Sequence, residues 1–386
     1  MTPDQLSAKF FDTYSLQPDA VMSAPGRVNL IGEFTDYNDG FVLPCAIGMR
    51  NYIAFRKRSD KQLNIVSVNY GGERDSYSIS DPIERTDKRW ANYVRGVAHA
   101  MQKRNISLAG VDMLMFGDVP QGGALSSSAA LEVCVAAVLN EVSGANLSKV
   151  ELARIGQQAE NEFMDCQCGI MDQMISACGV DGHALLIDCR DYSQQAIPIP
   201  ANLSIVIVNS NYPRQLVDSE YNARRKDCEE AAAAMGLASL RDANLSMLSD
   251  AKSHMSKNAF KRARHVISEN DRTQAAAKAL SENNFSELRE HIIASHESMH
   301  VDYEVTVPPT DGLVRICQDV LGNNGAARQT GGGFGGCIVA LCPPDAVQGV
   351  LSAIDERYEK RFALQATCFV SKAADGLAKL PRVNEQ

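Results

Sequence analysis

The sequence has a deficit of positive charge and no long apolar run. Its 386 residues include 38 Lys and Arg against 47 Asp and Glu, a formal net charge of -9. Nucleic-acid-binding proteins present basic surfaces, so this balance argues against that class. No apolar run approaches the ~18 residues that a membrane helix needs, and residues 1–10 lack the apolar core of a secretory signal. We therefore expect no nucleic-acid partner and no membrane segment.

The cysteines also lack the spacing of a disulfide framework. There are 11 of them, an odd number, scattered along the chain. Cys166 and Cys168 form a Cys-x-Cys pair without the second pair that a structural zinc site uses. Reduced thiols are the rule in the cytosol, so we expect a cytoplasmic protein with reduced cysteines, and we interpret the thiols of Cys166 and Cys168 as packing groups.

A glycine- and serine-rich segment stands directly before an apolar helical pattern. Gly122 and Gly123 carry no side chain and let a ligand approach the backbone. Ser126, Ser127 and Ser128 offer helix caps and hydroxyls, and a helix N-terminus favours an anion. The segment predicts a phosphate-binding loop. It has neither the P-loop lysine nor a dinucleotide fingerprint, and a plain capped helix after a glycine turn is the alternative.

An unusually acidic loop lies between two apolar segments near the N-terminus. Glu33, Asp36 and Asp39 fall between a strand expected at 21–31, interrupted by a Pro25–Gly26 turn, and further strand character at 41–44. Carboxylates accept hydrogen bonds from hydroxyl groups, so the loop suits a sugar. A solvated hairpin turn is the other interpretation.

Periodicity and turn signals divide the rest of the chain into helices and strands. Helices are expected near 1–17, 90–104, 129–142, 219–236, 257–280 and 285–300, with another that starts at Ser148 and carries Glu160 near its end, and strands at 50–80, 184–188, 203–208 and 337–341. Ser148 and Glu151 form a capping-box pattern. Trp90, the only tryptophan, is expected to pack, with stacking on a base as the alternative. The proline-containing stretch 190–202 suggests two domains, 1–195 and 196–386.

Several separated motifs together resemble one family, the galactokinases of the GHMP kinase superfamily. Residues 25–40 resemble the galactokinase signature, and 120–132 resemble the GHMP phosphate motif. Residues 168–173, Cys-Gly-Ile-Met-Asp-Gln, and the glycine-rich segment 331–336 resemble two further family motifs. The matches occur in one order from about residue 24 to 370, which makes the resemblance specific. It implies a two-domain α+β fold, with an N-terminal mixed α/β domain and a C-terminal ferredoxin-like domain.

The resemblance also implies an activity and a set of site residues. Galactokinases transfer the γ-phosphoryl group of ATP to the anomeric hydroxyl of α-D-galactose. Asp172 would be the base, with Arg27 beside it, and Ser128 and Glu160 would hold Mg²⁺. The residues implied to bind the sugar are Glu33, Phe34, Thr35, Asp36, Gly169 and Tyr221. Those implied to wrap the ATP phosphates are Gly122, Gly123, Ala124, Leu125, Ser126, Ser127 and Ser128. Galactose and ATP are the expected partners of a monomer.

The sequence departs from the family pattern in three places. Phe34 stands where galactokinases have a His placed near the sugar 6-hydroxyl, so a neutral hydrogen bond worth ~0.5–1.5 kcal/mol is missing. Gly123–Ala124 replaces the more usual Ala-Gly or Gly-Gly, and Gln329 replaces Met beside Arg328. We expect the first change to affect sugar discrimination and the other two to be tolerated.

Three other functions compete with this interpretation. His296, Glu297 and His300 fit the His-Glu-x-x-His pattern of zinc proteases, although a five-residue motif often arises by chance. Some galactokinase-like proteins sense sugar without turnover, but they lack residues within the serine motif, which is uninterrupted here. A kinase for N-acetylgalactosamine or another sugar is the third alternative, and the acidic loop does not separate it from a galactokinase.

Overall fold

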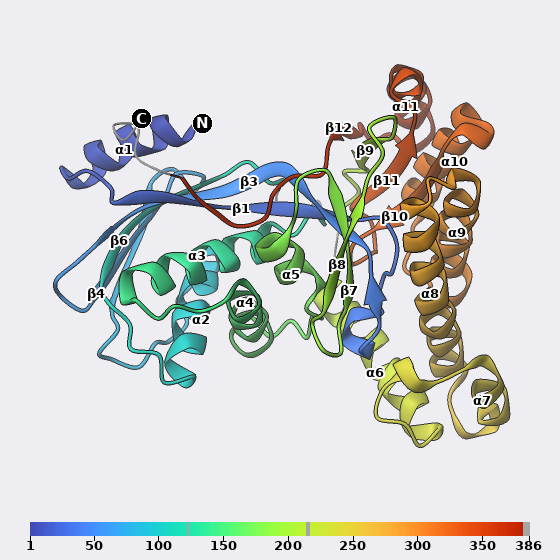
Figure 1. Ribbon diagram of the computed structural model, residues 1–386, viewed down its shortest axis with the longest axis horizontal. Coiled ribbons are helices and arrows are strands. Elements are labelled where there is room, and N and C mark those ends of the chain that lie inside the picture. The colour runs from blue at the N-terminus through green and yellow to red at the C-terminus, as the bar shows by residue number, and fades with distance from the viewer. Residues whose placement is uncertain (121, 123, 214–216, 381–386) are drawn as a thin grey trace.

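The chain folds into two parts that lie side by side (Figure 1). The computed structural model describes residues 1–386 except 121, 123, 214–216 and 381–386. The N-terminal part holds a long sheet with helices α1–α5, and the C-terminal part holds a second sheet with helices α8–α11. The α+β architecture expected from the sequence is confirmed.

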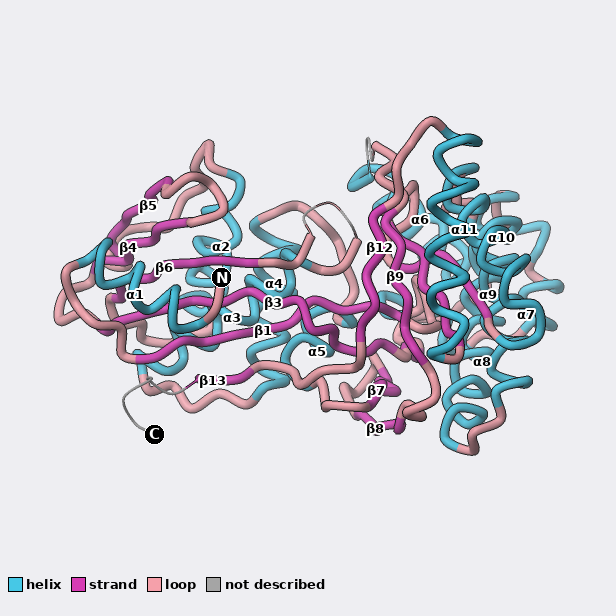
Figure 2. Tube along the Cα trace, turned by 90° about the horizontal axis from the view of Figure 1, so that it is seen from above, coloured by secondary structure: helices cyan, strands magenta, loops and turns pink. Residues whose placement is uncertain are grey.

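The larger sheet has six strands among the described residues, in the order β13-β1-β3-β6-β4-β5. Their bounds are β1 (Ala20–Asn29), β3 (Pro44–Lys57), β4 (Gln62–Ser67), β5 (Glu73–Ser78), β6 (Val111–Gly117) and β13 (Ala378–Leu380). Neighbours are antiparallel except β4 and β6, which run parallel. Strand β13, near the end of the chain, returns to pair with β1 along the edge of this sheet (Figure 2).

Side chains alternate between the two faces of this sheet, and each face packs into a different hydrophobic core. In β1, Met22 joins the main core and Val21 the opposite face, and in β6 Met113 and Leu114 divide in the same way. The main core is covered by α2 (Arg89–Lys103), α3 (Ser127–Ser143), α4 (Lys149–Phe163) and α5 (Met171–Cys178). The opposite face is covered by α1 (Pro3–Tyr14), which buries Leu6 and Phe10.

The C-terminal sheet is antiparallel throughout, in the order β10-β11-β9-β12. Its strands are β9 (Ser204–Asn209), β10 (Ala326–Thr330), β11 (Cys337–Cys342) and β12 (Thr367–Ser371). This order, with helical connections from β9 to β10 and from β11 to β12, is the ferredoxin-like arrangement. One face packs on α10 (Pro308–Leu321) and α11 (Val347–Phe362). The other elements of this half are α6 (Val217–Ala234), α7 (Leu245–Asp250), α8 (Lys257–Ser281) and α9 (Phe285–Ser298).

One hydrophobic core joins the two parts. Ile205 and Ile207 of β9 face Leu30 and Leu43, which flank the acidic loop, together with Leu280 of α8. A small sheet of β2 (Phe41–Val42), β7 (His183–Asp188) and β8 (Gln194–Pro198) lies beside this junction. The acidic loop is therefore built into the contact between the two parts.

One expectation about local structure needs correction, and one stretch contains a strand that the sequence did not predict. Strand β1 runs through Pro25 and Gly26 without a turn, because a shift in register between Pro25 and Arg27 absorbs the irregularity. The stretch 190–202 contains strand β8, which pairs with β7 as a sheet edge where Pro198 is tolerated. The division at residue 195 stays a proposal. The capping box of Ser148 and Glu151 is confirmed.

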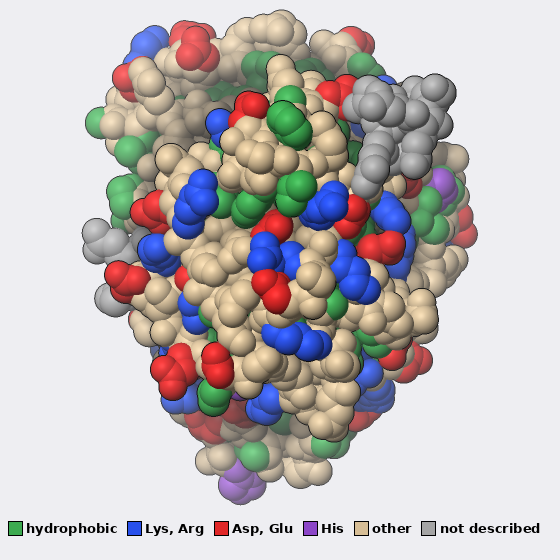
Figure 3. Space-filling model, turned by 90° about the vertical axis from the view of Figure 1, so that its left-hand side faces the viewer, with side chains coloured by type: hydrophobic (Ala, Val, Ile, Leu, Met, Phe, Trp, Pro, Cys, Tyr) green, Lys and Arg blue, Asp and Glu red, His purple; other side chains and the backbone are tan. Residues whose placement is uncertain are grey.

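The surface is mixed in charge on the side that Figure 3 shows. Basic and acidic side chains are interspersed there, so the net charge is not gathered into one field on that face. In the part of the chain that the structure describes, no helix combines the length and the apolar character needed to cross a membrane.

Phe10 tests how firmly α1 is held against the sheet. Its side chain is fully buried, whereas that of neighbouring Phe11 is 46% exposed. We expect Phe10→Ala to lower the free energy of unfolding by about 3–5 kcal/mol and Phe11→Ala to change it by less than about 0.5 kcal/mol. Urea unfolding curves measure both. Equal losses in the two variants would show that α1 is not docked through Phe10.

Candidate active site

A cleft of about 880 Å³ runs between the two parts of the molecule. It gathers most of the residues singled out in the sequence, from segments far apart in the chain. Those that line it are Arg27, Glu33, Phe34, Asp36, Gly122, Ala124, Leu125, Ser126, Ser127, Ser128, Glu160, Gly169, Asp172 and Tyr221. Gly123 lies outside the described residues. Thr35 is not among the described residues that line the cleft.

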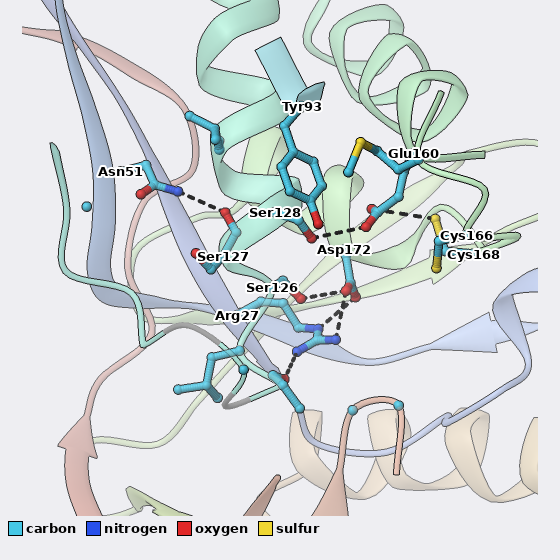
Figure 4. A pocket seen from close by; sticks show the side chains of 18 of the residues that line it. Arg27, Asn51, Tyr93, Ser126, Ser127, Ser128, Glu160, Cys166, Cys168 and Asp172 are labelled. Carbon is cyan, nitrogen blue, oxygen red and sulfur yellow. Dashed lines mark hydrogen bonds and ion pairs between the residues drawn. The ribbon is translucent and has the colours of Figure 1, made fainter. Parts of the chain in front are cut away.

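At the centre of the cleft, Arg27 of β1 and Asp172 of α5 form a bidentate ion pair (Figure 4). Arg27 Nε and Nη2 donate to the two carboxylate oxygens over 2.8 and 2.9 Å. Burial by itself lowers the pKa of Arg27, but the charges of Asp172 and Glu33 outweigh it and raise that pKa, so the guanidinium stays charged. Asp172 is thereby held as an oriented, partly exposed carboxylate, its side chain 31% accessible.

The serine loop is tied to the same pair. Arg27 Nη1 donates to the Ala124 carbonyl over 2.6 Å, and Ser126 Oγ donates to Asp172 Oδ2 over 2.5 Å. Ser126 has a left-handed backbone, with φ of 61°, and its side chain does not cap α3. The expectation that the serines cap the helix is therefore wrong at Ser126, because the Asp172 carboxylate takes its hydroxyl. The start of α3 is left without a side-chain cap at the edge of the cleft, as an anion site requires.

A second polar group lies on the α3–α4 side of the cleft. Ser128 Oγ donates to Glu160 Oε1 over 3.1 Å, so a hydroxyl and a carboxylate meet (Figure 4). Behind them, Gln173 Nε2 donates to both Glu160 Oε2 and Glu132 Oε2, each over 3.0 Å. Burial and the nearby Glu160 charge raise the pKa of Glu132 well above its usual value. Ser128 and Glu160 supply hard oxygen atoms of the kind that bind Mg²⁺.

The acidic loop is buried, and the hairpin alternative is wrong. Glu33 is only 2% exposed. Its Oε1 accepts hydrogen bonds from Arg328 Nη1 over 3.2 Å and from the Gly331 backbone N–H over 2.8 Å. Asp36 packs against Gly169, where a Cβ atom would come within 2.2 Å of the carboxylate. Any larger residue at position 169 would push Asp36 out of place.

Three carboxylates therefore crowd the inner end of the cleft. Burial, followed by the charges of Asp172 and Glu33, raises the pKa of Asp36 from 3.8 to about 7. Asp36 thus changes charge near neutral pH, at the end of the cleft where a hydroxyl-bearing ligand would meet it.

Aromatic rings form one wall beside this acidic end. Phe34 is 4% exposed and stacks on Tyr303 with ring centroids 4.4 Å apart, and Tyr221 lies 6.0 Å from Phe34. The backbone of Phe34 has a positive φ of 66°. Neighbouring Thr35 is fully buried, with Oγ1 within 2.6 Å of the Phe41 carbonyl and 3.0 Å of the Gly32 carbonyl. Thr35 therefore shapes the loop, and the structure does not place its hydroxyl toward a ligand.

Sequence reasoning missed much of the opposite end of the cleft. Residues there that it did not single out are Asn51, Tyr52, Asn69, Tyr70, Arg89, Tyr93 and Leu131. Trp90 also lines this end, stacks on Tyr70 with centroids 6.0 Å apart, and donates from Nε1 to Glu73 over 2.7 Å. The sequence had offered one signal for this end of the cleft, which was the possibility that Trp90 stacks on a base. The others come from strand β3, the loop between β4 and β5, and helices α2 and α3, and they share no local motif.

Gln329, the unusual residue of the last glycine motif, has a complete set of partners. Its amide nitrogen donates to the Val305 carbonyl over 3.0 Å, and its amide oxygen accepts from Thr310 Oγ1 over 2.6 Å. The fully buried polar side chain is thus satisfied, which is why the position tolerates it.

The His-Glu-x-x-His residues belong to a different neighbourhood. His296 Nδ1 accepts from the Gln329 backbone N–H over 3.3 Å, and Asp311 lies 3.5 Å from His296 and 3.1 Å from His300. Burial, followed by the Arg328 charge, lowers the pKa of His296 to about 3. Glu297, the base of a zinc protease in this pattern, is exposed.

Comparison with known proteins gives three family matches along the chain. The galactokinase galactose-binding signature matches residues 8–57, the GHMP kinases N terminal domain matches 92–180, and the GHMP kinases C terminal matches 276–360. These segments contain the acidic loop, the serine loop with Asp172, and the last glycine motif.

Solved structures agree with these matches. A galactokinase from Lactococcus lactis, crystallised with galactose, is 33% identical with a TM-score of 0.92, and the similarity covers 97% of this chain and 99% of that one. A mevalonate kinase from Methanococcus jannaschii shares the fold at 14% identity and a TM-score of 0.66, over 92% and 98% of the two chains. A phosphomevalonate kinase from Streptococcus pneumoniae also shares the fold, at 11% identity and a TM-score of 0.63, and the similarity covers 86% of this chain and 95% of that one.

The raised pKa of Asp36 leads to a stability prediction. In the folded protein the Asp36 carboxyl keeps its proton up to about pH 7, whereas in the unfolded chain it loses the proton near pH ~4. The contribution of Asp36 to the free energy of unfolding is therefore fully present below pH ~4 and is lost as the pH rises to about 7. We expect Asp36→Asn to stabilise the protein relative to the parent more at pH 8 than at pH 5. Urea unfolding at both pH values measures this, and equal differences would contradict the assignment.

Proposed function

The chain belongs to the galactokinase family of the GHMP kinases, and we propose that Asp172, Arg27 and the loops around them carry out the family reaction. The protein phosphorylates galactose at its anomeric hydroxyl with ATP, which gives galactose 1-phosphate and ADP. The observation that carries the assignment of residues is the Arg27–Asp172 pair, which lies between the acidic loop and the serine loop in one cleft.

In the proposed reaction, Asp172 accepts the proton of the anomeric hydroxyl. The sugar oxygen forms a bond to the γ-phosphorus, the bond to the β–γ bridging oxygen breaks, and ADP leaves. Phosphoryl transfer passes through a loose transition state, so placement and electrostatic stabilisation contribute most. Arg27 and Ser126 orient the carboxylate through bonds of 2.8, 2.9 and 2.5 Å. Arg27 also adds positive charge beside the transferred group.

The serine loop and the start of α3 are proposed to hold the ATP phosphates. The uncapped first turn of α3 suits an anion. Ser128 and Glu160 would hold Mg²⁺, with phosphate and water supplying the remaining oxygens, since no group of three His, Cys, Asp or Glu in the described chain is arranged for a metal. When bound, the metal neutralises charge on the phosphate oxygens. The outer end of the cleft, with Tyr70 and Trp90, offers rings for the adenine base.

The acidic end of the cleft is proposed to take the sugar. Glu33 has one oxygen committed to Arg328 and Gly331, and the Asp36 carboxylate lies beside Gly169, so both can accept from sugar hydroxyls. Phe34 and Tyr221 would contact the apolar side of the ring. The cytoplasmic location and the monomeric state stay predictions.

Replacing Asp172 by Asn tests the base. The amide keeps the shape but cannot accept the proton, so we expect kcat to fall by roughly 10²- to 10⁴-fold while galactose binding stays measurable. Coupled ADP release and calorimetry measure the two quantities. Asp12→Asn, at an exposed position of α1, is the matched control. A variant within tenfold of the parent, a barrier change of only ~1.4 kcal/mol, would remove Asp172 from the chemistry.

Replacing Phe34 by His tests sugar discrimination. An apolar wall rejects an analogue that lacks a hydroxyl only weakly, whereas a hydrogen-bonding site rejects it strongly. The positive φ of 66° at this position is one that His tolerates better than most residues. We expect Phe34→His to separate galactose from 6-deoxygalactose more sharply than the parent does, as ratios of kcat/KM.

Phe34→Leu is the apolar control and should leave this ratio as in the parent. Equal ratios in the parent and in Phe34→His would show that the sugar does not reach this side chain, and that Phe34 serves only the stack with Tyr303.

A further inference from the structure

A buried polar pair stands directly behind the Ser128–Glu160 site. Glu132 and Gln173 are both 0% exposed. The single amide nitrogen of Gln173 bridges the two carboxyl groups, donating to Glu132 Oε2 and to Glu160 Oε2 over 3.0 Å each. Neither Glu132 nor Gln173 is in the lining of the cleft as described, so the reaction proposed above does not use them directly.

Three helices meet at this pair. Glu132 lies one turn beyond Ser128 on the same face of α3, Gln173 follows Asp172 at the start of α5, and Glu160 comes from α4. Gly156 of α4 makes the close approach possible, because a Cβ atom there would lie 3.1 Å from Gln173 Cγ and 3.2 Å from Glu132 Cβ. The packing thus brings one amide within reach of both carboxyl groups.

The pair is costly as a purely structural feature. Gln173 Oε1 is buried and makes no hydrogen bond to other described residues, and Glu132 is a fully buried carboxyl group beside Glu160. A buried polar atom without a partner costs stability, and apolar side chains of similar volume would fill the same space. The one consequence of the pair that reaches the cleft is its hold on Glu160.

The hydrogen bond from Gln173 fixes which carboxylate oxygen of Glu160 faces the cleft. Gln173 occupies Oε2, which also lies 3.7 Å from the Cys168 thiol, while Oε1 faces Ser128 Oγ at 3.1 Å. The Glu160 carboxylate, fixed in this way, presents one oriented oxygen, Oε1, beside the Ser128 hydroxyl. Hydrogen-bonding partners behind a metal ligand commonly set its orientation and the affinity of the site.

We infer that Gln173, anchored by Glu132, is a positioning residue that orients Glu160 toward the nucleotide-bound cation. The inference rests on the metal site of the proposed function and adds a residue pair to it. Gln173 acts only through Glu160 and touches neither sugar nor phosphate. Its loss therefore changes the metal dependence of the reaction and leaves sugar affinity as it was.

The test is a titration of activity with Mg²⁺ in Gln173→Met, which keeps the length of the side chain and removes its donor. We expect the half-saturating Mg²⁺ concentration to rise about tenfold or more, with kcat recovered at high Mg²⁺. Galactose affinity measured without metal should stay within twofold of that of the parent, which is a difference of at most ~0.4 kcal/mol in binding free energy. A merely structural role would lower kcat at every metal concentration or weaken galactose binding.

Gln102→Met is the matched control. Gln102 donates to the Ile79 carbonyl over 2.8 Å near the end of α2, roughly 20 Å along the helix from the end that lines the cleft. Its metal titration should match that of the parent.

Glu132→Met completes a double-mutant cycle. Glu132 holds Gln173 and also lies directly against Glu160. Glu132→Met should therefore raise the half-saturating concentration by less than Gln173→Met, and the double variant should fall short of the sum of the two single effects. Galactose binding and circular dichroism establish that each variant is folded. If Gln173→Met is not folded, the shift and the recovery in Glu132→Met carry the test.

Glu160→Gln separates the two levels of the proposal. If it raises the half-saturating concentration while Gln173→Met and Glu132→Met do not, the positioning role is overturned and the metal site stands. If Glu160→Gln leaves the titration unchanged, the metal assignment and the positioning role both fall. Additive effects of Glu132→Met and Gln173→Met would overturn the anchoring by Glu132.

Discussion

The ion pair between buried Arg27 and partly exposed Asp172 is the interaction on which the site depends. It joins β1 to α5, and through Ala124 and Ser126 it also holds the serine loop. Removing one member of such a pair leaves an unpaired buried charge, which costs far more than an exposed ion pair contributes. The same bonds orient the carboxylate proposed as the base, so stability and catalysis rest on one contact.

The acidic loop connects this pair to the second half of the chain. Glu33 accepts from Arg328 and the Gly331 backbone, while the Gly32 N–H donates to Glu269 Oε1 over 3.0 Å. These buried groups fix, from the C-terminal side, the end of the cleft that is proposed to take the sugar, and the serine loop forms, on the N-terminal side, the end that is proposed to take the phosphates. The cleft is therefore shaped by both parts, and neither part forms the whole site.

Much of the fold was predictable because local signals are strong where helices are amphipathic or capped. The helices near 90–104 and 257–280 correspond to α2 and α8, and the capping box of Ser148 starts α4 as expected. Strand β8 was missed because a short edge strand with prolines resembles a linker until its partner β7 is known. The Pro25–Gly26 turn was wrong because pairing with β3 holds β1 extended across a bulge.

The sequence by itself singled out the groups that are proposed to carry the chemistry: the acidic loop, the serine loop, Asp172 and the last glycine motif. Local spacing encodes turns, caps and periodicity. Only the tertiary structure decided that Ser126 donates to the Asp172 carboxylate and does not cap the helix, and that Thr35 turns inward. It also decided that Gln173 reaches Glu160. Such choices depend on how distant elements pack, and no local pattern contains that information.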